Sequence, residues 1–191
     1  MPDRLYLSCW IRGFNEANML RYFEKLLSLF PFSQLTQRGP VLRVYAIERA
    51  EPPQMEREIS KPVDTAALVM GAREFAHADS GIEVEAAWDL WQFDGEWKLG
   101  PASVTLVCQG PEFETEDGDH LRIEFGPDAR FLPMEGVEGS LRMGQSNLRS
   151  LLHFVGEIEK NLPLENRRLW SESGRNFAGV VAEMINGWNV Q

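Results

Sequence analysis

The fold of this chain is decided by residues 82–125, which read IEVEAAWDLWQFDGEWKLGPASVTLVCQGPEFETEDGDHLRIEF. Apolar and polar residues alternate on both sides of Asp94-Gly95, a pair that strongly favours a tight hairpin turn. A second acidic turn at residues 116–119 predicts a second hairpin, which joins Phe113 to residues 120–125. The stretch therefore predicts an antiparallel sheet as the framework of the molecule.

A two-residue turn at Asp94-Gly95 determines which residues face each other across the first hairpin. With this turn, Trp91 pairs with Lys98, and one apolar set shares a face that we expect to lie in the core. This set comprises Trp88, Leu90, Trp97 and Leu99. Beyond Gly100-Pro101 the apolar phase moves to Val104, which predicts a bulge or a sharp bend at that step.

The segments before the hairpin predict a strand, a helix and a second strand, at residues 5–11, 15–30 and 41–47. This order is typical of a β-α-β unit, whose parallel crossover would be right-handed. Residues 51–62 are rich in proline and charge and predict a surface loop that includes a short helical turn. A helix is expected over residues 64–76, with Asp64 as its cap.

The C-terminal part predicts two amphipathic helices. The first begins at Gln145 or Ser146 and carries apolar residues at spacings of three and four, so we expect Leu151, Leu152 and Val155 to be buried. A polar connection over residues 164–176 leads to the final helix. The expected fold is α+β: a mixed, largely antiparallel sheet of about six strands, with an N-terminal β-α-β unit and amphipathic helices packed on it.

Length and composition limit the classes of protein to consider. A chain of 191 residues with 43% hydrophobic and 25% charged residues fits one α+β domain over residues 1–191. The net charge of −10 disfavours nucleic acid and anionic membrane surfaces as partners and is compatible with a basic protein partner. No apolar run reaches the roughly 18 residues of a membrane span, and no signal peptide is evident, so we expect a cytoplasmic protein. Cys9 and Cys108 fit small buried side chains.

No nucleotide-binding, zinc-protease or hydrolase motif occurs in the chain, and no cofactor is predicted. The carboxylates Glu83, Glu85 and Asp89 share one face of the first hairpin, as on a solvated sheet face, and His153 lies near the apolar stripe of its helix. Asp117, Asp119 and His120 offer metal-type ligands, but turn geometry alone explains them, so we predict neither a metal site nor catalytic residues. A hydrolase that uses sheet carboxylates with a histidine as acid/base is the alternative hypothesis.

Two aromatic segments are the candidate binding sites. Trp91 and Phe93 face away from Trp88, so they either form core beneath helices on both faces of the sheet or form an exposed aromatic strip. In the exposed case, Lys98 would stack over Trp91 as a cation–π contact. The second segment contains Arg167, Arg168 and Trp170, residue types that are often interface anchors and anion ligands.

These observations favour an acidic, non-catalytic binding protein that recognises a protein partner or a small ligand. The protein would bind its partner through the aromatic strip or the loop Arg167–Trp170. Nucleic acid and membrane are not expected as partners. A homodimer that hides the face of Trp91 and Phe93 is compatible with the same pattern. The argument for the strip depends on the hairpin register, which places Trp88 and Trp97 on one side.

Overall fold

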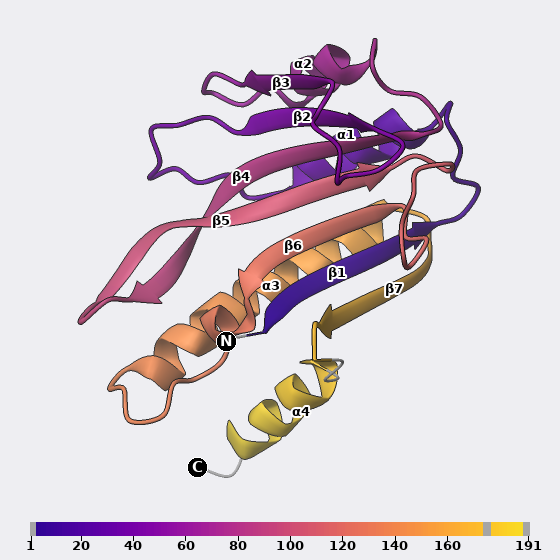
Figure 1. Ribbon diagram of the computed structural model, residues 1–191. Helices are drawn as coiled ribbons and strands as arrows, with labels where there is room; N and C mark the ends of the chain where they lie inside the picture. Colours follow the sequence, from indigo (N-terminus) through magenta and orange to yellow (C-terminus); the bar gives the residue numbers. More distant parts are fainter. Residues whose placement is uncertain (1–2, 174–176, 189–191) are drawn as a thin grey trace.

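The computed structural model describes residues 3–173 and 177–188, which contain one seven-stranded sheet with helices on it (Figure 1). The strands are β1 (Arg4–Ile11), β2 (Val41–Ala46), β3 (Met55–Glu58), β4 (Ser80–Phe93), β5 (Trp97–Gln109), β6 (Leu121–Pro127) and β7 (Leu164–Ser171). The helices are α1 (Met19–Leu29), α2 (Thr65–Ala72), a short 3₁₀ helix η1 (Asp128–Phe131), α3 (Ser140–Asn161) and α4 (Phe177–Trp188). The α+β class is confirmed.

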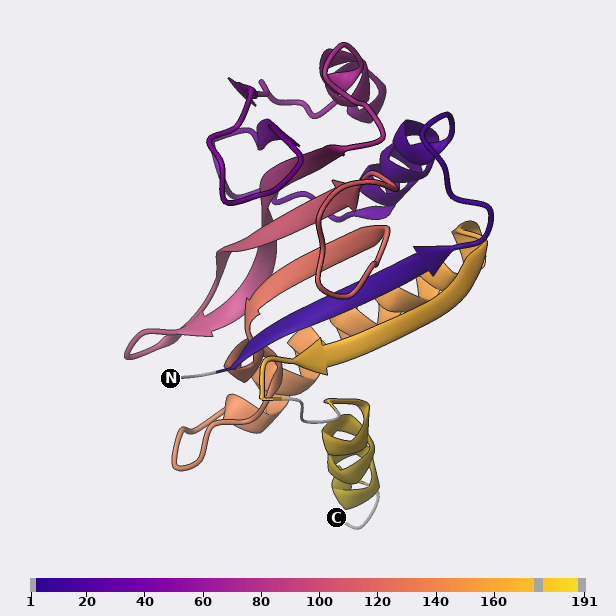
Figure 2. The ribbon, with the colours of Figure 1, turned by 45° about the vertical axis from the view of Figure 1, so that its right-hand side comes forward.

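The strand order is β3-β2-β4-β5-β6-β1-β7, and each neighbouring pair is antiparallel. α1 and α3 lie against one face of this sheet, and no helix of the described residues covers the opposite face, here called the open face (Figures 1 and 2). In β1, Leu5, Leu7 and Cys9 are fully buried beneath the helices. The alternation of the strands therefore directs one set of side chains into a single core layer.

The expected β-α-β unit is only partly right. β1 and β2 run in the same direction, because four successive antiparallel steps separate them, but β6, β5 and β4 lie between the two strands. They are not a parallel pair, and the sheet is antiparallel rather than mixed. The sheet has seven strands rather than about six because β3 and β7 form at the edges, within segments predicted as loops, while the strand expected at Phe113 does not form. Both edge strands are rich in charge and lack a clear alternation of apolar residues.

The predicted hairpin register is wrong. Phe93 pairs with Trp97 and Trp91 with Leu99, so the loop holds three residues, with Gly95 at a φ of +74°. A shift of one residue moves the whole second strand to the other face. Trp88 and Leu90 are buried as expected, but Leu99 is 46% exposed and Trp97 is half-buried on the opposite side.

The expected bulge at Gly100-Pro101 is also absent from the hairpin. Pairing runs without interruption from Phe93–Trp97 to Gly81–Gln109, with Leu90 opposite Gly100. The observed register places Ala102, Val104 and Leu106 on the core side without a bulge. The change of phase after Leu99 is therefore only a consequence of assuming a two-residue turn. Pro101 is tolerated because β6 pairs with β5 only at Thr105–Cys108.

The second predicted hairpin is not formed. β6 pairs with β5 and with β1, whereas Phe113 lies in the connecting loop, and its ring approaches to within 2.6 Å of the position that a Cβ on Gly81 would take. This contact explains a glycine at position 81, because any larger side chain would collide with a ring. The loop is folded back onto the sheet rather than extended as a strand.

The helices agree with the sequence in kind and differ in extent. Asp64 caps α2 by accepting a hydrogen bond from the amide of Ala67 at 3.1 Å. α3 begins before the expected start, and it buries Leu151 and Val155 while Leu152 is 41% exposed, against expectation. Trp88 packs on Phe154 of α3, with ring centroids 5.8 Å apart. The docking of α3 on the hairpin therefore forms the centre of the core.

The C-terminal segment adds an element outside the sheet layer. α4 follows β7 and lies beyond its C-terminal end, and its residues Phe177 and Val181 are buried (Figures 1 and 2). Residues 174–176 of the predicted connection lie outside the described residues. No helix in the described ranges combines the length and the apolar character that crossing a bilayer requires.

Candidate binding surfaces

The open face of the sheet carries a network of ion pairs at its centre. Arg43 on β2 contacts Glu83 at 3.3 Å and Glu85 at 2.8 Å on the adjacent strand β4. Arg49, just after β2, lies 2.6 Å from Glu83 and 2.5 Å from Glu124 on β6. Hydrogen bonds from Arg43 to Glu85 and Glu56 raise the pKa of this guanidinium above its ordinary value. These carboxylates serve as partners of arginines.

The residues of the hydrolase hypothesis are not assembled into an acid–base pair. Asp89 accepts hydrogen bonds from the Ser33 hydroxyl and from the Gln34 amide, the latter at 2.8 Å. His153 is exposed on α3, and His77 is exposed with its Nδ1 4.0 Å from a carboxylate oxygen of Glu16. Neither histidine approaches the paired carboxylates of β4, so the geometry gives this hypothesis no support.

His120 has a structural position at the end of β1. Its Nδ1 accepts a hydrogen bond from the Ile11 amide at 2.8 Å, and its ring stacks on Phe14 with centroids 4.2 Å apart. Burial lowers the pKa of His120, and an amide that donates to Nδ1 requires the lone pair of that atom. The neutral imidazole is therefore the form that this contact holds.

The acidic turn before His120 is held by an arginine. Both carboxylate oxygens of Asp119 accept from Arg122 at 2.8 Å, and Asp117 accepts from the same guanidinium at 3.0 Å. Gln109 donates a further hydrogen bond to Asp119 at 2.8 Å. Over residues 3–173 and 177–188, no group of three or more side chains of metal-ligand type is arranged to hold an ion.

One predicted site becomes a compact cluster, here called the Trp170 cluster, of Trp170, Tyr6, Ser8, Arg168 and Arg122. The rings of Trp170 and Tyr6 stack with centroids 4.6 Å apart, and the indole Nε1 donates to the Ser8 hydroxyl at 3.0 Å. The guanidinium carbons of Arg168 and Arg122 lie 5.2 and 5.9 Å from the indole centroid. The ring and the N–H group of this indole are therefore already in contact with other residues of the protein.

Tyr6 of the Trp170 cluster bonds to a carboxylate beside it, whereas Arg167 lies away from the cluster. The Tyr6 hydroxyl donates to Glu172 at 2.9 Å, and burial together with this carboxylate raises the pKa of Tyr6 to about 12. Arg167 lies on the other face of β7, because alternate residues of a strand point to opposite faces, and there it pairs with Glu159 of α3. The structure therefore separates Arg167 from Arg168 and Trp170.

The other predicted site lies at the tip of the hairpin, which projects beyond its neighbours (Figure 1). β2 pairs with β4 only over residues 80–85 and β6 pairs with β5 only over residues 105–108, so the distal half of the hairpin is a two-stranded ribbon. Trp91, Phe93 and Trp97 share one face of this ribbon, and the rings of Phe93 and Trp97 lie 5.2 Å apart.

These three aromatic residues line a cavity of about 210 Å³, here called the tip pocket. Its wall opposite the ribbon comes from the end of β6, from η1 and from the start of α3. The residues that line it are Trp91, Gln92, Phe93, Trp97, Pro127, Ala129, Arg130, Leu132, Met134 and Gly144. Phe93 and Met134 are 39% and 40% exposed, so the pocket opens to solvent between apolar side chains.

Two polar side chains, the buried Asn147 and the half-buried Arg130, bond to the flanks of the ribbon. Asn147 of α3 accepts from the Trp91 amide and donates to the Trp91 carbonyl, both at 2.9 Å, as a neighbouring strand would. Arg130 of η1 donates to the carbonyls of Ser103 at 3.1 Å and Phe125 at 2.9 Å, and burial lowers its pKa. These backbone groups of Trp91, Ser103 and Phe125 therefore have hydrogen-bond partners without a further strand.

Acidic residues stand in the chain segments that adjoin the lining of the tip pocket. Asp94 and Glu96 are exposed in the hairpin turn, and Glu135 and Glu138 are exposed in the loop before α3. The Glu138 carbonyl accepts a hydrogen bond from Trp97 Nε1 at 2.8 Å, which ties this loop to the hairpin.

The position of Lys98 corrects the expected cation–π contact with Trp91. It lies opposite Gln92, on the other face of the ribbon from Trp91, and its ammonium pairs with Glu96 at 2.6 Å. The register shift is the reason, because it moves Lys98 away from the aromatic face.

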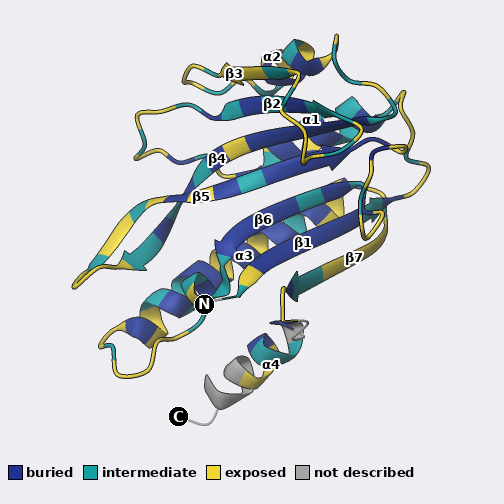
Figure 3. Cartoon of the chain, in the orientation of Figure 1, coloured by how far each residue is buried: buried dark blue, intermediate teal, exposed yellow. Residues whose placement is uncertain are grey.

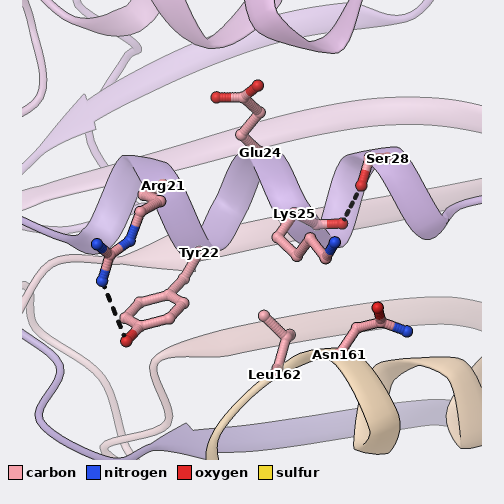
Figure 4. A pocket seen from close by; sticks show the side chains of 7 residues that line it. All are labelled: Arg21, Tyr22, Glu24, Lys25, Ser28, Asn161 and Leu162. Atoms are coloured by element: carbon pink, nitrogen blue, oxygen red, sulfur yellow. Dashed lines mark hydrogen bonds between the residues drawn. The ribbon is translucent and has the colours of Figure 1, made fainter.

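A second cavity, of about 470 Å³, lies between α1 and the end of α3 (Figure 4). Arg21 Nη2 lies 3.3 Å from the Tyr22 hydroxyl, to which it donates, and its guanidinium carbon is 5.0 Å from the ring centroid. Glu24 points away from Tyr22 and Leu162 in Figure 4. The polar groups that line this cavity are solvent-accessible or bonded to near neighbours. Its lining therefore does not indicate a particular class of ligand.

Sequence reasoning found Trp91 and Phe93 but missed Trp97 as a member of the same site, and it missed Arg130, Met134 and Asn147. Asn147 had a usable signal: it stands four residues before Leu151, within the apolar stripe of α3. A polar residue in such a stripe needs a buried partner, and the hairpin backbone is that partner.

No protein-family model matches this chain, and neither a curated protein nor a solved structure is similar enough to match it.

Proposed function

We propose that the protein is a non-catalytic binding protein and that the tip pocket is its recognition site. One observation carries the proposal: three aromatic side chains line an open cavity, and the outward backbone groups of Trp91 beside it already have hydrogen bonds. A surface of this kind offers apolar contact without the cost of unsatisfied polar groups. Apolar side chains that remain exposed around a cavity are typical of an interaction site.

The size of the tip pocket favours a protein partner over a drug-sized ligand. Its volume of about 210 Å³ lies below the roughly 300–1,000 Å³ of most small-molecule sites. A single apolar side chain, inserted from a partner, is the occupant that fits this volume. The exposed acidic residues in the adjoining segments and the net charge of −10 favour a partner with basic residues around that anchor.

A cytoplasmic location belongs to the same proposal. Cys9 and Cys108 are free thiols, both fully buried, and the strands that carry them are separated by β6. Unpaired cysteines suit a reducing compartment.

The binding proposal is tested by titrating ¹⁵N-labelled protein with N-acetyl-leucinamide and N-acetyl-phenylalaninamide while the indole and amide signals are followed. We expect saturable shifts at Trp91 and Trp97, with dissociation constants of about a millimolar, because one side chain alone provides few contacts. The indole of Trp170 serves as the internal reference and should not move.

Matched variants complete this experiment. Phe93→Ser removes one wall of the tip pocket and should abolish saturation, whereas Leu152→Ser alters a leucine of similar exposure, 41% against 39%, on α3. Shifts that stay linear with ligand concentration in the wild-type protein, or equal losses in both variants, would contradict recognition at the tip pocket.

A further inference from the structure

Arg130 of η1 lines the tip pocket without an acidic partner. It is half-buried, and it forms no ion pair within the described part of the chain. Burial lowers its pKa, and the positive charge of Arg4 lowers it further. Burial also opposes the charge of Arg49 and Arg122, but carboxylate partners outweigh it there and raise both pKa values. Arg130 is therefore a partly desolvated cation that no described carboxylate neutralises.

Three of the five N–H donors of Arg130 have no partner among the described residues. Nη1 donates to the carbonyls of Ser103 at 3.1 Å and Phe125 at 2.9 Å, which uses both of its hydrogens. Gly126 leaves room for this arrangement, because a Cβ there would lie 2.6 Å from Nη1. Nε and Nη2 carry the other three hydrogens, and neither atom is fully buried without a hydrogen bond. One side of the guanidinium is thus held by the protein, while the other remains available to a ligand.

The tip pocket therefore combines an apolar cavity with a cation. The rings of Trp91, Phe93 and Trp97 offer apolar contact, and the two nitrogens Nε and Nη2 match the two oxygens of a carboxylate. A polypeptide carries a side chain and a free carboxylate on the same Cα only at its C-terminal residue. A cavity of about 210 Å³ fits one such residue. The two features together indicate a chain terminus rather than an internal side chain.

The charges beyond the tip pocket favour a polypeptide terminus over a small free acid. The exposed carboxylates there are Asp94 and Glu96 in the hairpin turn and Glu135 and Glu138 in the loop before α3. In Figure 3 the tip of the hairpin and this loop are largely exposed. Together with the net charge of −10, these carboxylates repel a small anion. Basic residues just before a C-terminal residue offset this repulsion, whereas a free acid has none.

We propose that the tip pocket binds the C-terminal residue of a partner protein, whose apolar side chain contacts the aromatic rings and whose α-carboxylate pairs with Nε and Nη2 of Arg130. This inference rests on the proposed function, because it takes the tip pocket as the recognition site. Basic residues that precede the terminus face the acidic hairpin turn and the loop before α3. The bidentate pair distinguishes a chain end from an internal apolar residue, which has no carboxylate.

Two ligands that differ in one group test the role of the carboxylate. N-acetyl-leucine and N-acetyl-leucinamide present the same side chain, but only the first is charged at neutral pH. In titrations of ¹⁵N-labelled protein at low salt, the acid should bind about tenfold more tightly than the amide. The Nε–H signal of Arg130 should shift with the acid alone.

The outcome of this comparison separates the inference from the function on which it rests. If both ligands saturate with equal dissociation constants, carboxylate recognition is overturned and the tip pocket remains a recognition site. If neither ligand saturates, the proposed function fails as well. A wild-type preference for the amide also overturns the inference.

Matched variants assign the preference to Arg130. Arg130→Gln removes the cation and should reduce the ratio of the two dissociation constants from about ten to about one. Arg73→Gln changes the net charge equally, at an exposed position just after α2, and should leave the ratio within about twofold. A purely structural role of Arg130 would weaken both ligands alike and would not change their ratio. Equal ratios in the two variants overturn the assignment, and if Arg130→Gln is unfolded by circular dichroism, the two ligands on wild-type protein decide.

A peptide separates a protein terminus from a free acid. The acetylated peptide Lys-Lys-Ala-Ala-Leu with a free carboxylate should bind about tenfold more tightly than N-acetyl-leucine, because its lysines meet the exposed carboxylates. Its C-terminal amide should bind about tenfold more weakly than the peptide acid. A peptide acid that binds no more tightly than N-acetyl-leucine, or no more tightly than its own amide, overturns the proposal of a protein terminus.

Discussion

The Trp170 cluster and the tip pocket use the same kind of residue in opposite ways. The Trp170 indole has a stacked tyrosine, a hydroxyl for its N–H and two guanidinium groups beside its ring. At the hairpin tip, Trp91, Phe93 and Trp97 leave a cavity of about 210 Å³ between the ribbon and η1. An aromatic residue on a strand thus indicates a binding site only where its neighbours leave space beside it.

The arrangement of strands explains this difference. β7 lies directly beside β1, so Tyr6 stands opposite Trp170 and fills the space next to it. β4 and β5 extend beyond β2 and β6, and single side chains hold their flanks in place of strands. Single side chains fix the position of the ribbon without filling the volume around its aromatic face.

The largest loss of stability is expected for a substitution in the Trp170 cluster. Trp170→Ala should lower the free energy of unfolding by about 2–4 kcal/mol, because it removes ring stacking and leaves the Ser8 hydroxyl without its donor. Urea denaturation followed by circular dichroism measures this loss. A loss below about 0.5 kcal/mol would mean that the cluster is a surface feature, and the contrast with the tip pocket would fail.

The next effect concerns the attachment of the hairpin to α3. Asn147→Ala should cost about 1–3 kcal/mol, because the Trp91 amide, the Trp91 carbonyl and the Arg130 carbonyl all lose a partner. It should also shift the assigned ¹⁵N–¹H indole signals of Trp91 and Trp97 in the NMR spectrum. Asn161→Ala is the control, since Asn161 is exposed and bonds only within its own helix. Equal costs for the two variants would show that the ribbon does not depend on Asn147.

The Trp170 cluster should also make the stability of the protein depend on pH, through the ionisation of Tyr6. The pKa of Tyr6 is raised from its ordinary value of 10.0 to about 12, first by burial and then by Glu172. Because the folded state favours the protonated phenol, this stabilisation is complete below pH 10 and is lost as the pH rises toward 12. Burial also raises the pKa of Tyr45, so the test follows the component of the ultraviolet difference titration that ionises near pH 12, which Tyr6→Phe should remove. Persistence of the late titration in that variant would assign it to another tyrosine.

The smallest effect on stability is expected at the tip pocket itself. Phe93→Ala should cost less than about 1 kcal/mol, because the ring is 39% exposed and lies beside a cavity. The same urea experiment applies, with Trp170→Ala as the comparison. A cost near that of Trp170→Ala would show that Phe93 belongs to the core, and the tip pocket would lose its distinction as a binding site.

The sequence predicted those elements whose signal is local. The alternation of β1, the apolar stripe of α1 and the position of the hairpin turn were all predicted correctly. The face of Trp91 and Phe93 was also right, because residues two apart on a strand share a face whatever the register. The register argument for the strip nevertheless fails, because Trp88 and Trp97 lie on opposite sides of the hairpin, and the tip pocket is proposed instead from the cavity that Trp91, Phe93 and Trp97 line.

The errors lie where a distant segment decides the outcome. Asp94-Gly95 fits either a two-residue or a three-residue loop, and the observed loop brings Trp97 to the Glu138 carbonyl, 41 residues along the chain. Charged residues dominate β3 and β7, so the sequence predicts loops there. Each segment becomes a strand only by pairing with a neighbour that is already in the sheet. A single sequence does not show such partners.

The amino-acid sequence alone determined the framework: an α+β chain, built on a long hairpin, with α3 packed against it through a stripe of apolar residues. Periodicity and turn glycines are local properties, so the backbone obeys them wherever the element lies. Only the tertiary structure decided that other side chains pack against the Trp170 indole while Trp91, Phe93 and Trp97 border an open cavity. The space beside a side chain depends on elements that approach it from elsewhere in the chain, and their positions follow from packing of the whole core.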